Sequence, residues 1–212
     1  MIIQEYGGND MIAIIDYDAG NLRSVQKALN FIGEDAIITR DKEVLKKADK
    51  VILPGVGAFG DAMNKLESYG LISTIQQIAA SSTPFLGICL GLQLIFESSE
   101  ENPEWKGLNL LPGKILRIPD KEGLKIPQIG WNSLEFLNKA TLFQGIPKHA
   151  HVYFVHSYYL RATNREDVAA TTEYSTLIDA SVEHNNIFGC QFHPEKSGDV
   201  GLAILKNFAN IK

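Results

Sequence analysis

The sequence lacks most features that mark secreted, membrane-spanning or nucleic-acid-binding proteins. Only two of its 212 residues are cysteine, Cys89 and Cys190, so neither a disulfide framework nor a zinc site of paired cysteines is expected. No apolar run is long enough to span a bilayer. The net charge of -5 argues against a general affinity for nucleic acid or anionic membrane. We therefore expect a protein of the reducing cytoplasm.

The chain is expected to form one domain after a short extension. Residues 1–10 are polar at their end and lack the basic start and apolar middle of a signal peptide, so we expect them to be a loose, flexible extension. Residues 11–212 contain no internal repeat, low-complexity tract or linker. These residues should therefore fold as a single unit.

Short apolar runs alternate with helical patterns in the first half of the chain. The expected strands are Met11–Ile15, Ala36–Thr39, Lys50–Leu53 and Pro84–Ile88. Helices are expected from Leu22 to Gly33, from Asp41 to Ala48, in two stretches broken at Gly70, and after Cys89. This βαβα order predicts an α/β fold with a doubly wound, mostly parallel sheet, whose chemistry lies at the carboxyl ends of the strands.

Beyond Trp105 the pattern changes to short strands separated by turns, which we interpret as antiparallel or mixed additions to the sheet. A final helix is expected at Gly201–Ile211. The expected strands are Gly113–Ile118, Ile129–Leu137, His151–Phe154, Val168–Thr172 and Ile187–Phe192.

Cys89 has the sequence context of a nucleophile elbow, a sharp turn between a strand and a helix that exposes one side chain. Gly87 and Gly91, two residues on either side, leave room for the strained turn. The start of the helix would stabilise a thiolate, and the N–H of Leu90 could face the oxyanion of a tetrahedral intermediate. Taken alone, the pentapeptide is slightly more typical of a buried cysteine packed between glycines.

His193-Pro194-Glu195 directly follows an expected strand. Pro194 favours an extended backbone at His193, and in extended chain the carboxylate of Glu195 would lie beside the imidazole and fix its tautomer. A cysteine, a base and an orienting carboxylate together have the composition of a catalytic triad. His-Pro-Glu alone could equally be an ordinary turn.

A glycine-rich loop, Pro54-Gly-Val-Gly57, follows the third expected strand. It lacks the Gly-Lys-Ser/Thr ending of a phosphate loop and a full dinucleotide fingerprint, so an oxyanion-binding role fits better, and we expect no cofactor and no metal. Gln93 lies four residues after Cys89 on the same helix face, where its amide could bind a polar substrate. Cys190 and the remaining histidines, His149, His151, His156 and His184, are expected to be structural or surface residues.

With these segments assembled, the chain resembles the class I glutamine amidotransferases. The resemblance rests on PGVGAFG, PFLGICLGLQ and FGCQFHPE, which occur in the family's order and cover most of the domain. It implies a flavodoxin-like core and hydrolysis of L-glutamine to glutamate and ammonia through a cysteine thioester. The catalytic residues would be Cys89, His193 and Glu195. The oxyanion hole would comprise Val56, Gly57 and Leu90, and glutamine would be held by Gly55, Gly57, Gln93, Ser157 and Tyr158.

Finer features resemble the glutaminase subunits of imidazole glycerol phosphate synthase, a heterodimeric enzyme of histidine biosynthesis. They are IIDYDAGNLRSV, Val56 in place of a second proline, PQIGWN, YFVHSY and Lys196-Ser197. The resemblance implies a (β/α)8 cyclase subunit that receives ammonia through a channel to make imidazole glycerol phosphate and AICAR. Two residues depart from the pattern: Asp18 replaces a common glycine, and Gln128 a common histidine. The positions that match the partner interface are Asn21, Trp131, Tyr153 and Lys196.

Three alternatives stay open at the level of sequence. The chain could be the glutaminase subunit of a different synthase, such as the anthranilate or aminodeoxychorismate type or a paralogue with another acceptor. It could be a cysteine hydrolase of γ-glutamyl compounds that acts alone. It could also be a flavodoxin-like binding module in which Cys89 has no catalytic role.

Overall fold

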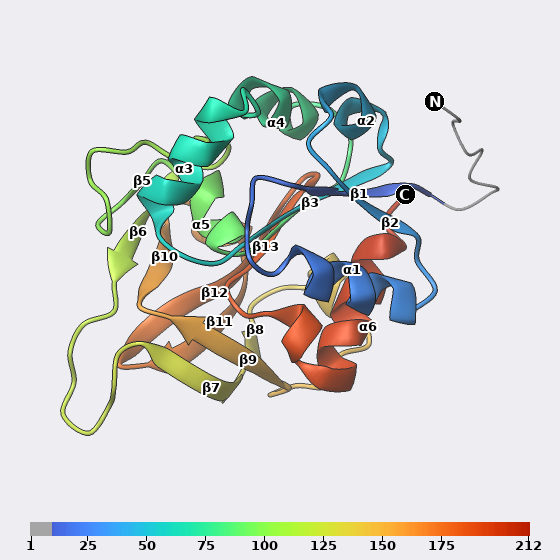
Figure 1. The fold of residues 1–212 in the computed structure, drawn as a ribbon. Helices are drawn as coiled ribbons and strands as arrows, with labels where there is room; N and C mark the ends of the chain where they lie inside the picture. Colours follow the sequence, from blue (N-terminus) through green and yellow to red (C-terminus); the bar gives the residue numbers. More distant parts are fainter. Residues whose placement is uncertain (1–9) are drawn as a thin grey trace.

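The computed structural model describes residues 10–212, so the extension predicted for residues 1–10 lies outside the described residues except for Asp10. Within this range eleven strands form one sheet (Figure 1). Its parallel half has the spatial order β2-β1-β3-β4-β13. These strands are β1 (Ile12–Ile15), β2 (Ala36–Thr39), β3 (Lys50–Gly55), β4 (Phe85–Cys89) and β13 (Ile187–Cys190).

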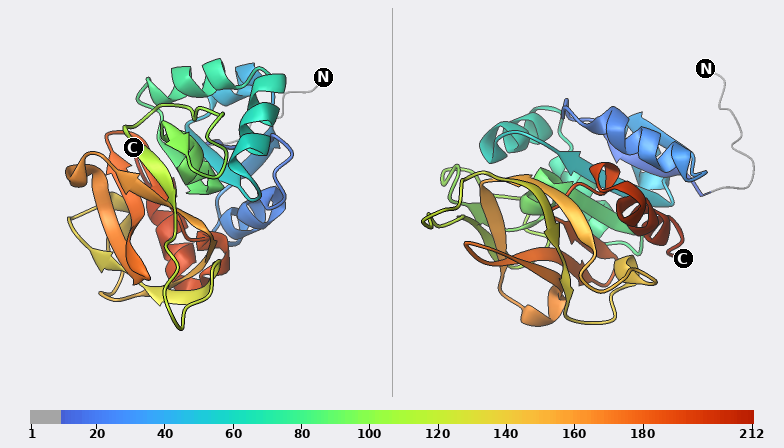
Figure 2. Two further views of the ribbon diagram at one scale, coloured as in Figure 1. Left: turned by 90° about the vertical axis from the view of Figure 1, so that its left-hand side faces the viewer. Right: turned by 90° about the horizontal axis from the view of Figure 1, so that it is seen from below.

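The parallel strands β1, β3, β4 and β13 are buried on both faces because helices cover each side of the sheet, whereas the edge strand β2 is only partly buried (Figures 1 and 2). Alternate residues of β1 show this: Ala13 and Ile15 pack on one side, and Ile12 and Ile14 on the other. The first side is covered by α2 (Lys42–Lys47), α3 (Phe59–Ser68) and α4 (Ile72–Ala79), and the second by α1 (Leu22–Phe31) and α6 (Gly198–Ala209). Each of these helices, and α5 (Leu90–Ile95), is too short to cross a membrane.

The other half of the large sheet is mainly antiparallel and continues from β13 through β12, β10 and β6 to the short edge strand β5. A separate two-stranded sheet joins β7 and β9. The bounds are β5 (Ser98–Ser99), β6 (Gly113–Arg117), β7 (Gln128–Ser133), β8 (Glu135–Phe136), β9 (His151–His156), β10 (Tyr158–Ala162), β11 (Val168–Tyr174) and β12 (Thr176–His184). Single 3-10 turns cover Thr141–Phe143 (η1), Arg165–Asp167 (η2) and Pro194–Lys196 (η3).

The predicted α/β class with a mostly parallel sheet and antiparallel additions is confirmed. The single strand expected at Ile129–Leu137 is wrong, because β7 and β8 belong to different sheets. Strand β12 was missed because its buried side chains include the polar Asp179 and Ser181, which interrupt the apolar pattern. Both polar groups are satisfied: Arg165 pairs with Asp179, and the Ser181 hydroxyl donates to a backbone carbonyl.

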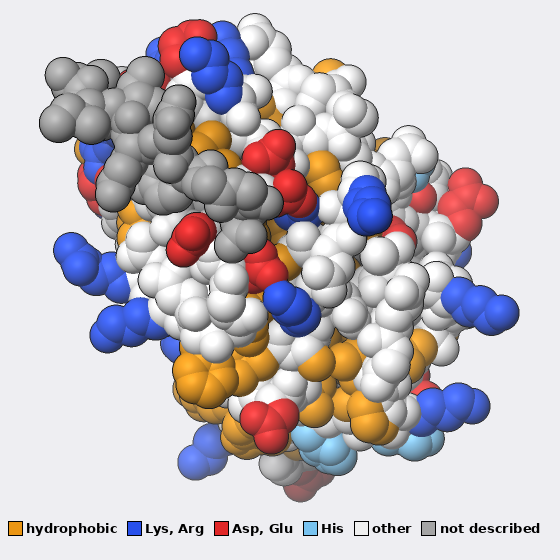
Figure 3. All heavy atoms as spheres, turned by 90° about the vertical axis from the view of Figure 1, so that its right-hand side faces the viewer, with side chains coloured by type: hydrophobic (Ala, Val, Ile, Leu, Met, Phe, Trp, Pro, Cys, Tyr) orange, Lys and Arg blue, Asp and Glu red, His pale blue; other side chains and the backbone are white. Residues whose placement is uncertain are grey.

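The face that carries β2, α1 and α6 shows charged side chains of both signs scattered among uncharged ones (Figure 3). No continuous positive patch is visible among the described residues on this face. The distribution agrees with the acidic net charge of the sequence.

Candidate active site

Cys89 ends β4 and directly precedes α5, as expected for a nucleophile elbow. Its backbone has φ of +53° and ψ of -106°, a conformation that non-glycine residues rarely adopt. A Cβ atom at Gly91 would lie 1.7 Å from the carbonyl oxygen of Leu53, so only glycine lets α5 pack this closely on β3. The tight packing of β4 and α5 against β3 thus imposes the turn that places the nearly buried cysteine at the edge of a cavity.

His193 is brought to Cys89 by sheet topology, because β13 pairs with β4 and the chain leaves β13 just before the histidine. His193 Nδ1 and Glu195 Oε1 lie 2.8 Å apart, and neither side chain is exposed. The extended backbone predicted at Glu195 is wrong, because Glu195 lies in the 3-10 turn η3. This turn, together with extended backbone at His193, directs the carboxylate back to the imidazole.

The protonation of His193 follows from these contacts. Since Nδ1 faces Glu195, Nε2 is the nitrogen available for chemistry, and it is buried without a hydrogen-bond partner among the described residues. Burial alone would lower the pKa of His193, but its interactions with Cys89 and Glu195 outweigh burial and raise the pKa to about 9. Burial likewise favours neutral Glu195, but the bond to His193 keeps the pKa of Glu195 below its usual value.

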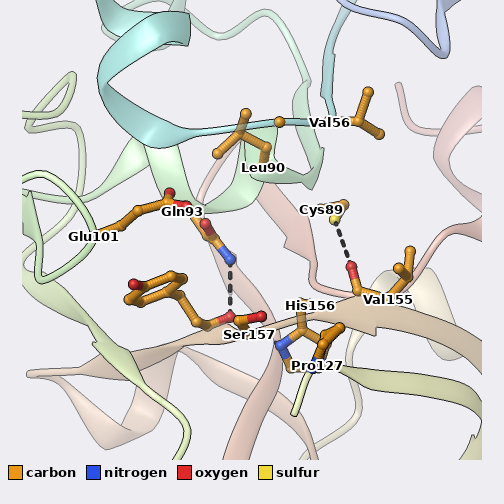
Figure 4. Close-up of a pocket in the computed structure, with 11 residues that line it drawn as sticks. Val56, Cys89, Leu90, Gln93, Glu101, Pro127, Val155, His156 and Ser157 are labelled. Atoms are coloured by element: carbon orange, nitrogen blue, oxygen red, sulfur yellow. Dashed lines mark hydrogen bonds between the residues drawn. The ribbon is translucent and has the colours of Figure 1, made fainter.

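The thiol of Cys89 contacts two polar groups, of which Figure 4 shows the carbonyl of Val155. Its Sγ atom lies 3.9 Å from the carbonyl oxygen of Val155 on β9 and 3.8 Å from Nε2 of Gln191. In this geometry the thiol donates to Val155 and accepts from Gln191. Gln191 belongs to the FGCQFHPE segment, but its local sequence predicts no role for it.

A cavity of about 290 Å³ opens beside Cys89 (Figure 4). It brings together the loop after β3, the start of α5, and the segment that joins β9 to β10, which are far apart in the sequence. Its lining includes six residues predicted to bind substrate or the oxyanion: Val56, Gly57, Leu90, Gln93, Ser157 and Tyr158. The cavity is large enough for a small polar molecule such as an amino acid.

Gly55, which was also predicted to contact substrate, is not among the residues that line this cavity. A Cβ atom there would lie 2.3 Å from the hydroxyl of Tyr17 and 2.9 Å from Cβ of Leu90. The absence of a side chain at Gly55 therefore allows Tyr17 and Leu90 to pack under the oxyanion loop. The structure gives this glycine a packing role.

Glu101 is a lining residue that the sequence analysis missed. Its Oε2 atom accepts a hydrogen bond of 2.8 Å from the N–H of Phe59, at the start of α3. This contact ties the acidic side chain to the element that directly follows the glycine-rich loop. No local pattern distinguishes Glu101 from its acidic neighbours, and only the tertiary structure places it in the cavity.

The two departures from the family pattern have structural explanations. Asp18 has a φ of +65°, a conformation that glycine adopts most easily, and its carboxylate contacts Arg40 at 2.7 Å and Tyr69 at 2.5 Å. The bonds to Tyr69 and Arg40 lower the pKa of Asp18. Gln128 is buried and lies 3.1 Å from Nε2 of His156, whose pKa burial lowers to about 4. His156, expected to be structural or on the surface, also lines the cavity.

Three of the four residues predicted at a partner interface lie together on the surface. Trp131 on β7 is 55% exposed and packs edge-on against Tyr153 on β9, with ring centroids 6.2 Å apart. Lys196 is exposed in η3, and the backbone N–H of Tyr153 donates to the hydroxyl of the adjacent Ser197. These three residues, Trp131, Tyr153 and Lys196, are called the β7–η3 surface below.

Asn21 does not belong to this surface. It is only 5% exposed, and its Nδ2 atom donates a 3.1 Å hydrogen bond to Oε1 of Glu195. In the free chain it therefore supports the His193–Glu195 pair from within the protein. The turn before α1 points toward the end of β13, which the local sequence does not show, and the interface role of Asn21 stays a prediction.

A nucleophile elbow, a His–Glu pair and a cavity with a few polar groups at the ends of parallel strands define a cysteine amidohydrolase site. The family model described as Glutamine amidotransferase class-I matches residues 13–211, and the chain belongs to that family.

Within this family, the chain is similar to curated proteins that share one name. The protein named imidazole glycerol phosphate synthase subunit HisH from Moorella thermoacetica is 50% identical over 200 residues, which are 94% of each chain. The protein of the same name from Syntrophotalea carbinolica is 48% identical over 206 residues, covering 95% of this chain and all of its own. The structure of PurLQS from Thermotoga maritima shares the fold at 20% identity, with a TM-score of 0.73 over 96% of this chain and 99% of that one.

Proposed function

We propose that this protein is the glutaminase subunit of imidazole glycerol phosphate synthase and supplies ammonia for histidine biosynthesis. The observation that carries the proposal is the grouping of Cys89, which lines the cavity, with the buried pair of His193 and Glu195. The relatives that are about half identical over nearly the whole chain support the choice of synthase. The family membership excludes the alternative of a flavodoxin-like binding module.

Hydrolysis begins with attack of the Cys89 sulfur on the side-chain amide carbon of glutamine. The tetrahedral intermediate carries its negative charge on the former carbonyl oxygen. The N–H of Leu90 is suited to bind this oxygen because Leu90 is the first residue of α5 and its N–H has no acceptor within the helix. A second donor comes from the Val56–Gly57 segment, which lines the same cavity.

His193 moves the protons in both halves of the reaction. Protonated Nε2 gives its proton to the departing ammonia, which leaves Cys89 as a thioester of glutamate. Neutral Nε2 then takes a proton from water as the water attacks the thioester, and glutamate and the thiolate are released. Glu195 keeps the Nδ1 proton in place throughout, since its Oε1 lies 2.8 Å from that nitrogen.

In the cavity, protein groups contact both the side-chain amide end and the α-amino end of glutamine. Gln93, Ser157 and Tyr158 surround the position next to Cys89, and Gly57 leaves the loop backbone open to the substrate. The carboxylate of Glu101 is the acidic side chain of the cavity and suits the positively charged α-amino group. A charge pair of this kind would favour glutamine over amides that lack the amino group.

The ammonia acceptor is proposed to be a (β/α)8 cyclase subunit that docks on the β7–η3 surface and forms a heterodimer. Ammonia must stay unprotonated to react, so a shielded channel between the two subunits suits the chemistry. The proposed setting is the cytoplasm, where a catalytic thiol stays reduced. A glutaminase of this type should be slow until its partner and the partner's ligand are present, since idle turnover would waste glutamine.

Reconstitution tests this function. The protein is combined with the cyclase subunit encoded in the same genome, and glutamate formation is measured with and without the cyclase substrate. We expect a stable one-to-one complex, slow glutaminase turnover of the free chain, and strong activation in the complex. Full turnover by the free chain would instead favour a hydrolase that acts alone, and activation only by another synthase would favour the paralogue alternative.

Trp131→Ala should weaken the complex without unfolding the chain. Trp131 is more than half exposed, so its removal costs little stability, but a central interface tryptophan typically contributes about 2 kcal/mol or more, which is roughly 30-fold in Kd. Binding is measured by isothermal titration calorimetry. Phe31→Ala is the matched control: Phe31 is 79% exposed at the end of α1, near the amino end of β2, and its loss should leave Kd unchanged. Equal effects of the two variants would contradict the proposed docking surface.

A further inference from the structure

Gln191 is a buried polar residue that the proposed mechanism does not use. Its side chain is completely buried and lies between Gln93 of the cavity and the sulfur of Cys89. An amide side chain has two donors and two acceptor sites, and burying it without partners is costly. Gln191 satisfies this requirement through contacts with the catalytic site, which indicates that its position serves the reaction.

The direction of the hydrogen bonds around Gln191 follows from chemistry. The carbonyl oxygen of Tyr158 can only accept, so the amide atom of Gln93 that lies 2.9 Å from it is the nitrogen. The same nitrogen lies 3.1 Å from Gln191, which must therefore present its oxygen to Gln93. The amide nitrogen of Gln191 is then left to face Cys89, 3.8 Å from Sγ. The orientation of the Gln191 amide is thus fixed by the backbone carbonyl of Tyr158, through the two hydrogen bonds that Gln93 donates.

From this geometry we infer that Gln191 is a further catalytic residue, which donates a hydrogen bond to the thiolate of Cys89 and holds the sulfur in place for attack. The inference rests on the proposed function. A donor from a neutral amide stabilises the charged sulfur more than the neutral thiol, and the thiolate is the nucleophile.

The contact with Val155 gives this donor a specific consequence. Before ionisation the thiol donates to the carbonyl oxygen of Val155 and accepts from the amide of Gln191, so Sγ is both a donor and an acceptor. Once the proton has left, the carbonyl repels the thiolate, whereas the Gln191 donor attracts it. Ionisation therefore releases the sulfur from Val155 and keeps it next to Gln191, where it can interact with His193.

The same contacts connect substrate binding with the nucleophile. Gln93 lines the glutamine cavity, and its amide nitrogen orients Gln191. A shift of Gln93 when substrate binds would therefore change the direction of the Gln191 donor. Removing the donor should lower kcat more than it raises KM, because Gln191 does not line the cavity and its amide nitrogen faces the sulfur.

The test measures the rate at which iodoacetamide alkylates Cys89, as a function of pH, in the full-length protein. The titratable groups that interact with Cys89 are His193, Tyr17 and Cys190, with Glu195 acting on His193, and all are kept intact. Gln191→Glu keeps the size of the side chain and an oxygen that accepts from Gln93, but replaces the donor by an acceptor. Gln191→Met removes the amide and keeps the approximate volume.

We expect the midpoint of the alkylation profile to move up by about one pH unit in Gln191→Met, and further in Gln191→Glu, since hydrogen bonds to charged groups have this strength. In the reconstituted complex kcat should fall about tenfold in Gln191→Met, while KM changes much less. Gln26→Met is the control, because it removes a part-buried amide that donates to the backbone of Ala36, away from the site. It should leave both measurements unchanged.

Unchanged midpoints in both Gln191 variants would overturn the inference, even if thermal stability fell, because a purely structural role lowers stability without moving the profile. Labelling of the wild-type protein separates this outcome from failure of the proposed function. If a glutamine-analogue electrophile does not label wild-type Cys89 in the complex, the glutaminase assignment itself is wrong. If it does, and the Gln191 variants titrate like wild type, only the role of Gln191 is rejected.

Discussion

Cys89→Ala is expected to lower glutamine-dependent turnover of the reconstituted complex by at least about 10⁴-fold, because no other group can form the thioester. The measurement is glutamate release at saturating glutamine. Labelling by a glutamine-analogue electrophile should disappear at the same time. The substitution removes one sulfur atom, so the fold and the complex should persist.

Two controls isolate the role of this thiol. Ammonium salts supply ammonia without glutamine, so the cyclase reaction of the Cys89→Ala complex should be retained when they replace glutamine. Cys190→Ala tests the other cysteine, which lies in the core and whose burial raises the pKa of its thiol. This variant should keep both labelling and turnover. Substantial glutaminase activity in Cys89→Ala would show that the nucleophile has been misassigned.

His193→Gln should reduce kcat by about 10²- to 10⁴-fold, the usual contribution of a general acid and base. Glutamine retains polar groups but cannot transfer the proton to ammonia or accept one from water. Single-turnover measurements in the complex should show slow thioester formation and slow hydrolysis alike. A loss confined to one of these half-reactions would contradict the assignment of both proton transfers to His193.

The same residue makes stability depend on pH in a predictable direction. The pKa of His193 is about 9 in the folded protein, above its ordinary value near 6.5, so the folded state binds this proton more tightly than the unfolded chain. The resulting stabilisation is fully present below pH 6.5 and is lost as the pH rises through about 9. It should be on the order of 1–3 kcal/mol in urea titrations and absent from His193→Gln.

Cys89→Ala provides an independent check of that pH dependence. Interaction with Cys89 is the largest contribution that raises the pKa of His193, ahead of the one from Glu195. The difference in unfolding free energy between pH 6 and pH 9.5 should therefore shrink in Cys89→Ala. If that variant kept the full wild-type difference, the His193–Cys89 interaction would not be its cause.

Val155, Gln191 and His193 surround the sulfur of Cys89. The thiol donates to a carbonyl on β9, and Nε2 of His193 has no hydrogen-bond partner among the described residues. β9 pairs with β7, which carries Trp131 of the β7–η3 surface. Trp131 and Tyr153 of the proposed docking surface thus lie in the same two-stranded sheet as Val155, whose carbonyl contacts the nucleophile.

Local patterns were sufficient for the elements that carry the triad. The apolar runs before Pro54 and Cys89 predicted β3 and β4, and the glycines at 87 and 91 predicted the turn at Cys89. These features are visible in sequence because strands buried on both faces need continuous apolar residues, and a close helix–strand contact excludes a Cβ atom. The same logic failed for β12, where buried polar residues depend on distant partners for their hydrogen bonds.

By itself the sequence determined the α/β class, the succession of the first four strands with their helices, and the three chemical groups of the triad, because each depends on residues close together in the chain. That β13 joins the parallel half of the sheet beside β4 was decided by the tertiary structure. Only the tertiary structure decided that Asn21 supports Glu195 inside the protein, that Glu101 enters the cavity, and that Gln191 faces the sulfur of Cys89. These contacts join residues between 42 and 174 positions apart. Their geometry is set by how the sheet packs, and no local pattern encodes it.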